Sequence, residues 1–234
     1  LLANHAIGKG YKTVFILKSP DSAYTLRLPE YFAEVFTKKG GAVAGEGTYS
    51  LGQQDFAAEV TKIKAMIPQP DVIMTAAYEP DFPAFLKQLR GAGVTSPVLG
   101  SDGIDSPTTT GLGDIAKGIV HTTAGFPAEG TKLAEFYAKF KAATGAAPET
   151  VYVATGYEIP YIIDAAVTAA GTMEGPALRD AIANLKDVEL LTGKVTYAGT
   201  NRMPNRDITL VEIQGGGRKP ILTATPDAAD VPAP

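Results

Sequence analysis

The chain of 234 residues has no cysteine and only two histidines. The absence of cysteine excludes disulfides, thiolate metal sites and thiol catalysis, and it leaves the cellular compartment open. No apolar run approaches the ~18 residues that a membrane helix needs. Lys and Arg number 21 against 25 Asp and Glu, so a nucleic-acid-binding surface has no electrostatic support. With 45% hydrophobic residues, the composition is that of an ordinary globular protein.

Strands and helices alternate through the first half of the chain. Amphipathic helical patterns begin near Tyr24, Phe56 and Phe82. Before, between and after them come apolar runs typical of buried strands: Thr13–Lys18, Ala42–Tyr49, Asp71–Ala77, Pro97–Gly100 and Gly118–Thr123. Alternation in units of this length predicts the α/β class, with a parallel, doubly wound sheet and right-handed connections.

After Gly125 helical patterns dominate. They cover Thr131–Ala143, about 150–170 and Pro176–Leu185, and only short strands are expected near 194–197, 208–213 and 221–223. Gly215–Gly217 is expected to form a hairpin turn between the last two strands. The apolar faces of the helices need a sheet that these residues do not supply. The last ten residues, 225–234, are rich in Pro, Ala and Asp and are expected to form a loose tail.

Polar side chains follow two neighbouring strands at the points where the strands end. Tyr78 comes directly after the run Asp71–Ala77, and Asp102 follows Pro97–Gly100. Open parallel sheets bind ligands outside the carboxyl ends of their strands. The residues alone therefore predict a crevice that holds a small polar molecule.

Catalytic and metal chemistry have little support in the sequence. His121 lies in a predicted strand, where a buried, hydrogen-bonded structural role is expected. The acids Asp71, Asp81 and Asp105 are too dispersed to indicate a metal site, and no nucleophile elbow, phosphate loop or HExxH motif occurs. We therefore expect no enzyme activity, no catalytic residues, no metal and no cofactor.

Five stretches together resemble one family of proteins. They are VFILKSPDSAY, EGTYSLGQQDFAAEVTKIKAMIPQPDVIMTAAY, FLKQLRGAGVTSPVLGSDG, GIVHTTAGFP and ATGYEIPYIIDAAVTAAG. In this order they are similar to the type I periplasmic solute-binding proteins, specifically the branched-chain amino acid (Leu/Ile/Val) receptors of ABC importers. The resemblance runs along about residues 1–223.

The resemblance implies a fold of two doubly wound α/β lobes joined by a hinge of three chain crossings. Residues 5–122 and 207–222 would form the second lobe, 125–205 a remnant of the first lobe, and 225–234 a tail. Crossings are expected near Thr122–Gly125 and near Arg206. The N-terminal segment of the first lobe would be absent from this sequence, so half of the clamp would be missing and this stretch alone would bind a ligand weakly at most.

The resemblance also assigns ligand-binding roles to four residues. Tyr24 would face the ligand, Tyr78 would wall the side-chain pocket, Asp102 would accept the ligand ammonium, and Tyr152 would cover the ligand from the first lobe. Two details differ from the family pattern: Tyr-Thr replaces the usual Tyr-Gly at Tyr24, and the shorter aspartate replaces glutamate at Asp102.

Each of the four residues also has a purely structural interpretation. Tyr24 would be an aromatic that packs at the start of a helix, and Tyr78 a strand-end tyrosine with its hydroxyl in water. Asp102 would belong to an ordinary Ser-Asp-Gly turn. Tyr152 would be one more aromatic on a packed helix face.

The function that the resemblance implies is the extracytoplasmic substrate-binding component of an ABC importer. Its ligand would be a small amino acid or related solute bound between the lobes, and its partner an ABC permease in the membrane. The protein would be periplasmic or a cell-surface lipoprotein. Two alternatives remain: the same fold could bind aromatic or other small carboxylates, or it could serve as a ligand-sensing regulatory domain.

Overall fold

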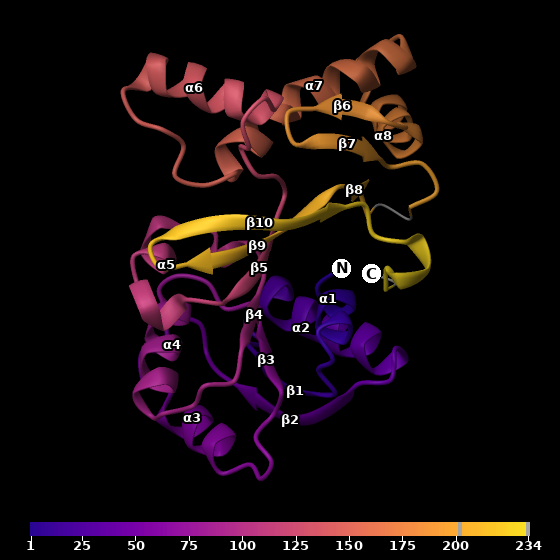
Figure 1. Cartoon of the computed structure of the whole chain (residues 1–234). Helices are drawn as coiled ribbons and strands as arrows, with labels where there is room; N and C mark the ends of the chain where they lie inside the picture. Colours follow the sequence, from indigo (N-terminus) through magenta and orange to yellow (C-terminus); the bar gives the residue numbers. More distant parts are fainter. Residues whose placement is uncertain (201–202, 233–234) are drawn as a thin grey trace. The chain divides into compact units, whose positions relative to one another are not determined.

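The computed structural model describes residues 1–200 and 203–232. The chain forms two compact units (Figure 1). Unit 1 contains Leu1–Thr123 and Leu210–Leu222, and unit 2 contains Ala124–Thr209 and Thr223–Pro234.

A seven-stranded sheet forms the centre of unit 1. Its strands are β1 (Thr13–Lys18), β2 (Ala42–Thr48), β3 (Val72–Thr75), β4 (Val98–Gly100), β5 (Val120–Thr123), β9 (Ile208–Gln214) and β10 (Gly217–Ala224). Their order across the sheet is β2-β1-β3-β4-β5-β9-β10. The pairs β1–β2, β1–β3, β3–β4 and β4–β5 are all parallel. The predicted parallel α/β arrangement is therefore confirmed.

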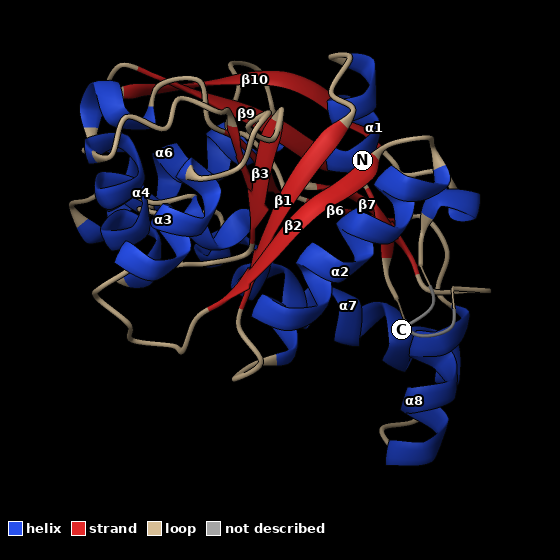
Figure 2. Cartoon of the chain, turned by 90° about the horizontal axis from the view of Figure 1, so that it is seen from below, coloured by secondary structure: helices blue, strands red, loops and turns tan. Residues whose placement is uncertain are grey.

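Helices cover both faces of this sheet (Figure 2). The long helices are α1 (Leu2–Gly8), α2 (Ala23–Lys38), α3 (Ala57–Lys64) and α4 (Asp81–Gly91), and shorter turns follow at η1 (Asp102–Ile104), α5 (Pro107–Thr110) and η2 (Gly113–Ala116). Strand β1 shows why two layers form, because its side chains alternate between the faces. Phe15 and Leu17 join the core with α3 and α4, whereas Val14 and Ile16 join the core with α1 and α2.

Helix α2 illustrates how local sequence fixes an element. Ser22 caps its N-terminus, and the Ser22 hydroxyl accepts a hydrogen bond from the Thr25 N–H at 3.2 Å. Phe32, Val35 and Phe36 are spaced to lie on one face, and all three are buried. Burying each such side chain stabilises the fold by about 1.5–3 kcal/mol. The cap and the apolar face together place the first turn of α2, which carries Tyr24, at the end of β1.

Unit 2 is built mainly from helices. These are α6 (Lys132–Thr144), α7 (Tyr152–Ala170) and α8 (Gly175–Asn184). A small antiparallel sheet contains β6 (Val188–Leu190), β7 (Gly193–Thr196) and β8 (Asn205–Arg206), in that order. The apolar cluster of this unit has three fully buried members, Leu133, Val151 and Ala154, with half-buried Phe136 and Tyr137 against them.

Several details of the second half differ from the sequence-based expectation. The strands β6 and β8 were not predicted, because Val188–Leu190 and Asn205–Arg206 are short and include charged residues. The expected loose tail contains a 3-10 turn, η3 (Ala228–Asp230), within its described part. The chain passes from unit 2 back to unit 1 between Thr209 and Leu210, and a crossing is expected near Arg206; the assignment of these segments to two lobes stays a prediction. Gly215 and Gly216 do form the hairpin turn between β9 and β10, both with positive φ.

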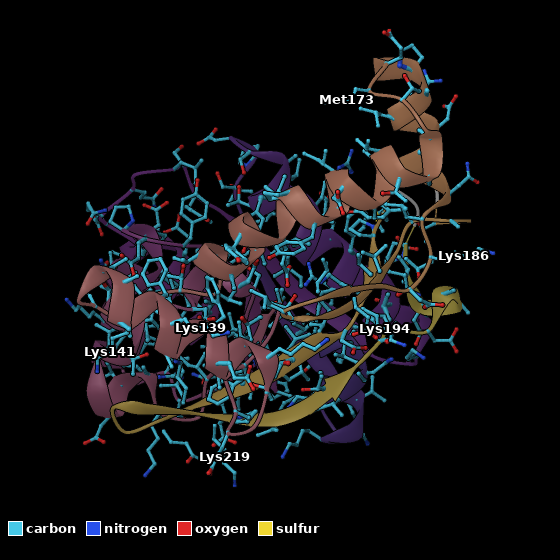
Figure 3. All side chains as sticks on the ribbon, turned by 90° about the horizontal axis from the view of Figure 1, so that it is seen from above. Lys139, Lys141, Met173, Lys186, Lys194 and Lys219 are labelled. Atoms are coloured by element: carbon cyan, nitrogen blue, oxygen red, sulfur yellow. The ribbon has the colours of Figure 1, made fainter. Side chains whose placement is uncertain are left out.

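Helix α7 leaves much apolar surface exposed, as expected for a unit with few strands. Its large exposed side chains are between 44% and 55% accessible: Tyr152, Tyr157, Ile159, Tyr161 and Ile163. Met173, in the turn after α7, is 77% exposed and projects from the unit (Figure 3). Among the helices that the structure describes, none is long and apolar enough to cross a lipid bilayer.

Candidate functional site

The candidate site lies at the carboxyl edge of the unit 1 sheet. Strands β1, β3 and β4 are neighbours and parallel, so the segments that follow them emerge at the same edge. The chain places β2 on one side of β1 and β3 on the other, which makes the β1–β3 boundary the topological switch point. Doubly wound sheets bind ligands at this point. Tyr24 follows β1 and Tyr78 follows β3, so both residues flank it.

The Tyr24 hydroxyl is at the centre of a network of hydrogen bonds. It donates to Asp102 Oδ1 at 2.6 Å and accepts from the Gly103 N–H at 2.8 Å. Its oxygen also lies 2.7 Å from Ser101 Oγ. A phenol has one proton and two lone pairs. Since the proton goes to Asp102, the Ser101 hydroxyl must be the donor in the remaining contact, and the hydroxyl of Tyr24 is then fully used.

Asp102 is consequently oriented by Tyr24 and keeps acceptor capacity. The residue is only partly buried, and one of its oxygens is held by the Tyr24 hydroxyl. In the part of the chain that the structure describes, the other oxygen, Oδ2, has no hydrogen-bond partner. A charge-assisted hydrogen bond to a carboxylate contributes about 1.5–3 kcal/mol. The arrangement is suited to bind a cationic or hydrogen-bond-donating group.

Two glycines let this turn pack closely against the strand ends. A Cβ at Gly100 would lie 2.4 Å from Cδ1 of Ile104, so the glycine allows Ile104 to fold back into the core. A Cβ at Gly103 would lie 2.8 Å from Cβ of Tyr78 and 3.0 Å from the Tyr24 hydroxyl oxygen. The lack of a side chain at Gly103 is therefore what allows the Gly103 N–H to reach the phenol.

Tyr78 supplies the second aromatic ring of the site. Its ring centroid lies 6.0 Å from that of Tyr24, and the ring planes are inclined by 62°. This edge-to-face arrangement is a favourable one for two aromatic rings. Both rings are partly exposed, so together they offer apolar surface beside the Asp102 carboxylate.

His121 is buried in β5 beside this turn. The partner of its Nδ1 is the Thr122 carbonyl at 3.0 Å, which can only accept, so Nδ1 carries the proton. Its Nε2 is buried and has no hydrogen-bond partner among the described residues. Burial lowers the pKa of His121, and the Thr122 carbonyl and the Asp102 charge oppose this shift. The expected buried, hydrogen-bonded histidine is observed, and its hydrogen bond is made through Nδ1.

Three of the four predicted site residues lie together in unit 1. Tyr24, Tyr78 and Asp102 meet at one sheet edge, although their role in ligand binding stays a prediction. Tyr152 is the first residue of α7 in unit 2 and is 48% exposed, and its role also stays a prediction. The sequence did not assign Ser101 and Gly103 to the site. The signal for them was their position on either side of Asp102, directly after a strand.

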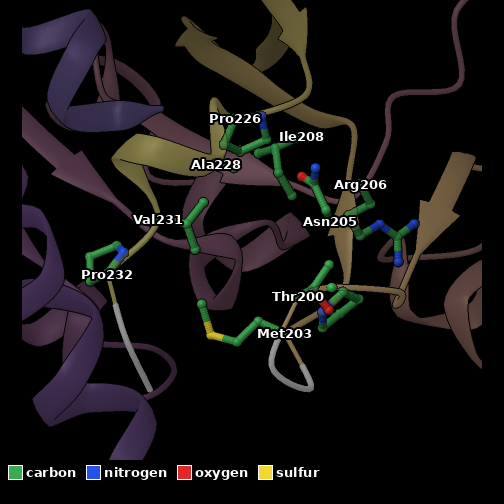
Figure 4. Close-up of a pocket in the computed structure, with 11 residues that line it drawn as sticks. Thr200, Met203, Asn205, Arg206, Ile208, Pro226, Ala228, Val231 and Pro232 are labelled. Carbon is green, nitrogen blue, oxygen red and sulfur yellow. The ribbon is translucent and has the colours of Figure 1, made fainter. Parts of the chain in front are cut away.

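A separate cavity of about 380 Å³ lies within unit 2 (Figure 4). Its walls are mostly apolar, and they are formed by Gly199, Thr200, Met203, Pro204, Asn205, Arg206, Ile208, Pro226, Ala228, Val231 and Pro232. Nη2 of Arg206 contacts the Thr192 hydroxyl and lies 3.6 Å from Glu158 Oε2, whereas the buried Nε of Arg206 has no hydrogen-bond partner among the described residues. In the described residues, no group of three or more His, Asp or Glu side chains is arranged to hold a metal.

Comparison with known proteins identifies the family. The sequence model of the family described as "Periplasmic binding protein" matches residues 2–218. The chain therefore belongs to the periplasmic binding protein family, a family of solute-binding proteins, as the resemblance predicted.

Individual relatives agree with this assignment. The Leu/Ile/Val-binding protein BraC3 of Rhizobium johnstonii is 25% identical over 197 residues, which are 83% of this chain and 52% of that protein. The leucine-binding protein LivK of Thermotoga maritima superposes with a TM-score of 0.84 at 24% identity, over 96% of this chain and 64% of that chain. A solute-binding protein from R. palustris, solved in complex with benzoate, has a TM-score of 0.77 at 20% identity, over 96% and 61%. The chain spans about half the length of the curated relatives that it matches.

Proposed function

We propose that this chain is the extracytoplasmic solute-binding component of an ABC importer, and that it binds a small amino acid or a related solute with a cationic amino group. Membership of the periplasmic binding protein family supports the class of function. The names of BraC3 and LivK support amino acids as the ligand class. The regulatory alternative has no such support among these relatives.

The observation that carries the proposal is that only one oxygen of the Asp102 carboxylate has a hydrogen-bond partner among the described residues. Tyr24 fixes Oδ1, and Oδ2 has no partner in the described residues, at the edge where such sheets bind ligands. A ligand ammonium would supply the missing donors. The partly exposed rings of Tyr24 and Tyr78 would flank the apolar part of the ligand.

In the proposed mechanism the solute docks on unit 1, and a second lobe closes over it with Tyr152 as part of its cover. The closed form is then what a membrane permease recognises. A ligand drives closure only if it binds the closed form better. Moving the population from 1:99 to 99:1 takes ~5.5 kcal/mol. One shielded ammonium–carboxylate pair and contact with two aromatic rings would supply a large part of this.

The proposed cycle contains no chemical step. Asp102 is held by the Tyr24 phenol, and His121 is fully buried with its Nδ1 bonded to the Thr122 carbonyl, so neither side chain is paired with a nucleophile that it could activate. We expect no turnover of esters, phosphates or sugars in a screen at neutral pH. Catalytic release of a product from any of these substrates would contradict this part of the proposal.

The experiment is a titration of the protein with L-leucine, L-isoleucine and L-valine. The NMR signals of the tyrosine rings are the readout, because they also detect binding with millimolar affinity. We expect shifts at Tyr24 and Tyr78. Asp102→Asn should weaken binding about tenfold or more, because the charge-assisted bonds are lost. Asp114→Asn, in the exposed turn η2, is the matched control and should leave the affinity unchanged. Equal affinity of the Asp102→Asn variant and the unaltered protein would contradict the assigned role.

A second candidate ligand class is a small aromatic carboxylate. The pair of tyrosine rings favours it, as does the benzoate-bound relative of the same fold. The two classes respond oppositely to one substitution. Asp102→Asn weakens the binding of an ammonium ligand, but it strengthens the binding of benzoate, because a repulsive charge is removed. Tighter benzoate binding combined with no amino acid binding would establish the second class.

A further inference from the structure

Asp105 is a buried carboxylate close to the candidate site but outside its proposed ligand contacts. It is 5% exposed, and both of its oxygens are engaged. Oδ2 accepts from the Thr123 hydroxyl at 2.8 Å, and Oδ1 pairs with the Arg218 guanidinium. A buried charge is costly unless it is paired and hydrogen-bonded. These contacts therefore hold the side chain of Asp105 in one place.

The two partners of Asp105 lie on two strands that lead out of unit 1. Thr123 is the last residue of β5 and of the first segment of unit 1, and unit 2 begins with Ala124. Arg218 is the second residue of β10, the strand along which the chain leaves unit 1 after Leu222. One carboxylate thus joins the end of β5 to the start of β10.

The backbone of Asp105 closes the turn that carries Asp102. Its N–H donates to the Asp102 carbonyl at 3.0 Å, at the end of the 3-10 turn Asp102–Ile104. At the start of the same turn, the Gly103 N–H donates to the Tyr24 hydroxyl at 2.8 Å. The turn is consequently fixed at one end by the Tyr24 phenol and at the other end by the residue whose side chain holds Thr123 and Arg218.

We propose that Asp105 is a positioning residue that fixes the Asp102 turn and couples it to the end of β5 and the start of β10. Asp105 does not contact the ligand. Its effect on affinity rests on the function proposed above, whereas its effect on the turn does not. A displacement of β5 or β10 would reach Asp102 through this carboxylate, and a ligand held by Asp102 would in turn bias those segments.

A purely structural role for the ion pair leads to a different expectation. Buried ion pairs often contribute little net stability, and breaking one mainly leaves an unpaired charge. In that case the substitution Asp105→Asn lowers the global stability, and all amides of unit 1 exchange faster in proportion. A positioning role instead loosens the turn Asp102–Ile104 selectively.

The first measurement is residue-resolved amide hydrogen exchange under native conditions, and it needs no ligand. Asp105→Asn removes the negative charge opposite the Arg218 guanidinium and replaces one of the two acceptor oxygens by an NH2 group, which weakens the contacts that hold this side chain. We expect the Gly103 amide to exchange about tenfold faster or more, relative to core amides such as that of Ile16. Arg218→Met should act in the same direction.

Asp71→Asn is the matched control. The Asp71 carboxylate bonds the backbone N–H groups of Lys12 and Thr13, at 2.8 and 2.9 Å, at the amino edge of the same sheet. It should reduce stability without a selective effect on Gly103. Unchanged relative protection of Gly103 in the Asp105→Asn or Arg218→Met variant, or an equal selective loss in the Asp71→Asn variant, overturns the proposal.

The second measurement is titration with L-leucine. We expect Asp105→Asn to weaken binding about fivefold or more, and Asp71→Asn to leave it unchanged. Loosened Gly103 exchange with unchanged L-leucine affinity overturns the coupling to the ligand. If the unaltered protein binds none of the amino acids tested, the proposed function fails, and the exchange experiment still decides whether Asp105 positions the turn.

Discussion

The two units of this protein reach stability by different means. Unit 1 has two extensive apolar clusters, one on each face of its sheet, with many side chains fully buried. Among the described residues of unit 2, the apolar cluster of Leu133, Val151 and Ala154 is small, and α7 keeps five large apolar side chains exposed. In this protein, a sheet covered by helices on both faces buries far more apolar surface than the helices and short strands of unit 2 do.

The described part of unit 2 contains a buried charged side chain. Glu158 of α7 is 2% exposed and accepts from the Thr192 N–H at 2.7 Å and the Thr192 hydroxyl at 2.8 Å. Arg206 pairs with its other oxygen at 3.6 Å. Helix α7 is thus tied to the loop before β7 and to β8 by polar contacts, whereas the helices of unit 1 are held by apolar ones.

The largest expected effect is in the core of unit 1. Phe85→Ala removes a fully buried ring that packs edge-on against Phe56 at 5.6 Å, and it should cost about 3–5 kcal/mol of unfolding free energy. The same change at half-buried Phe140 in unit 2 should cost about 1 kcal/mol. Urea unfolding followed by circular dichroism measures both values. Equal costs would remove the distinction between the units.

The next largest effect is in the polar centre of unit 2. Arg206→Met leaves the Glu158 carboxylate buried without its cation, and we expect a loss of about 1.5–3 kcal/mol. Arg179→Met is the control, because the Arg179–Asp180 pair is exposed and should contribute nothing measurable. If both variants unfold at the same urea concentration, Glu158 is not the element that holds unit 2 together.

Mild acid should lower the stability of unit 1 more than that of unit 2, since both histidines of the chain, His5 and His121, are in unit 1. Burial lowers the pKa of His121 below its usual 6.5. Below pH 6.5 the unfolded chain therefore binds a proton that the folded unit does not, and the stability of unit 1 falls as the pH falls. Urea unfolding between pH 7.5 and roughly 5.5 measures this loss.

Substitutions distinguish the contributions of the two histidines. His121→Asn should reduce the pH dependence of the stability of unit 1. His5→Gln should change it less, because His5 is less buried, although burial also lowers its pKa. Retention of the full pH dependence in the His121→Asn variant would show that another group is responsible.

The smallest effect is expected at the exposed face of α7. Ile159 is 55% exposed, so Ile159→Ser should change the unfolding free energy by less than about 0.5 kcal/mol. The same change should reduce the binding of a hydrophobic dye, whereas Lys139→Ser, on the exposed part of α6 in Figure 3, should not. A large loss of stability for Ile159→Ser would mean that α7 is packed after all.

Unit 1 could be predicted from sequence because its central strands β1, β3 and β4 are buried on both faces. Runs such as Val14–Leu17 and Val72–Met74 are continuously apolar, and each is followed by an amphipathic helix. The strands of unit 2 carry no such signal. Glu189 is exposed in β6, and β8 consists of Asn205 and Arg206 alone, so their pairing depends on tertiary contacts.

The site was only partly predictable for a related reason. The positions of Tyr78 and Asp102 follow from topology, since parallel strands bring their carboxyl ends to one edge. The resemblance to the family added Tyr24. The fully used hydroxyl of Tyr24 had no sequence signal, nor did the pair of Asp105 and Arg218, which are 113 positions apart. Such contacts depend on the folded geometry rather than on any local pattern.

The close packing around Gly103 limits how this protein can acquire a new ligand. Even the methyl group of alanine would press on Tyr78 and on the phenol oxygen of Tyr24 there, at 2.8 and 3.0 Å. Any substitution at Gly103 would therefore displace the backbone that presents the Asp102 carboxylate. Homologues that bind other ligands would be expected to change Tyr24, Tyr78 or Asp102 and to keep the glycine at this turn.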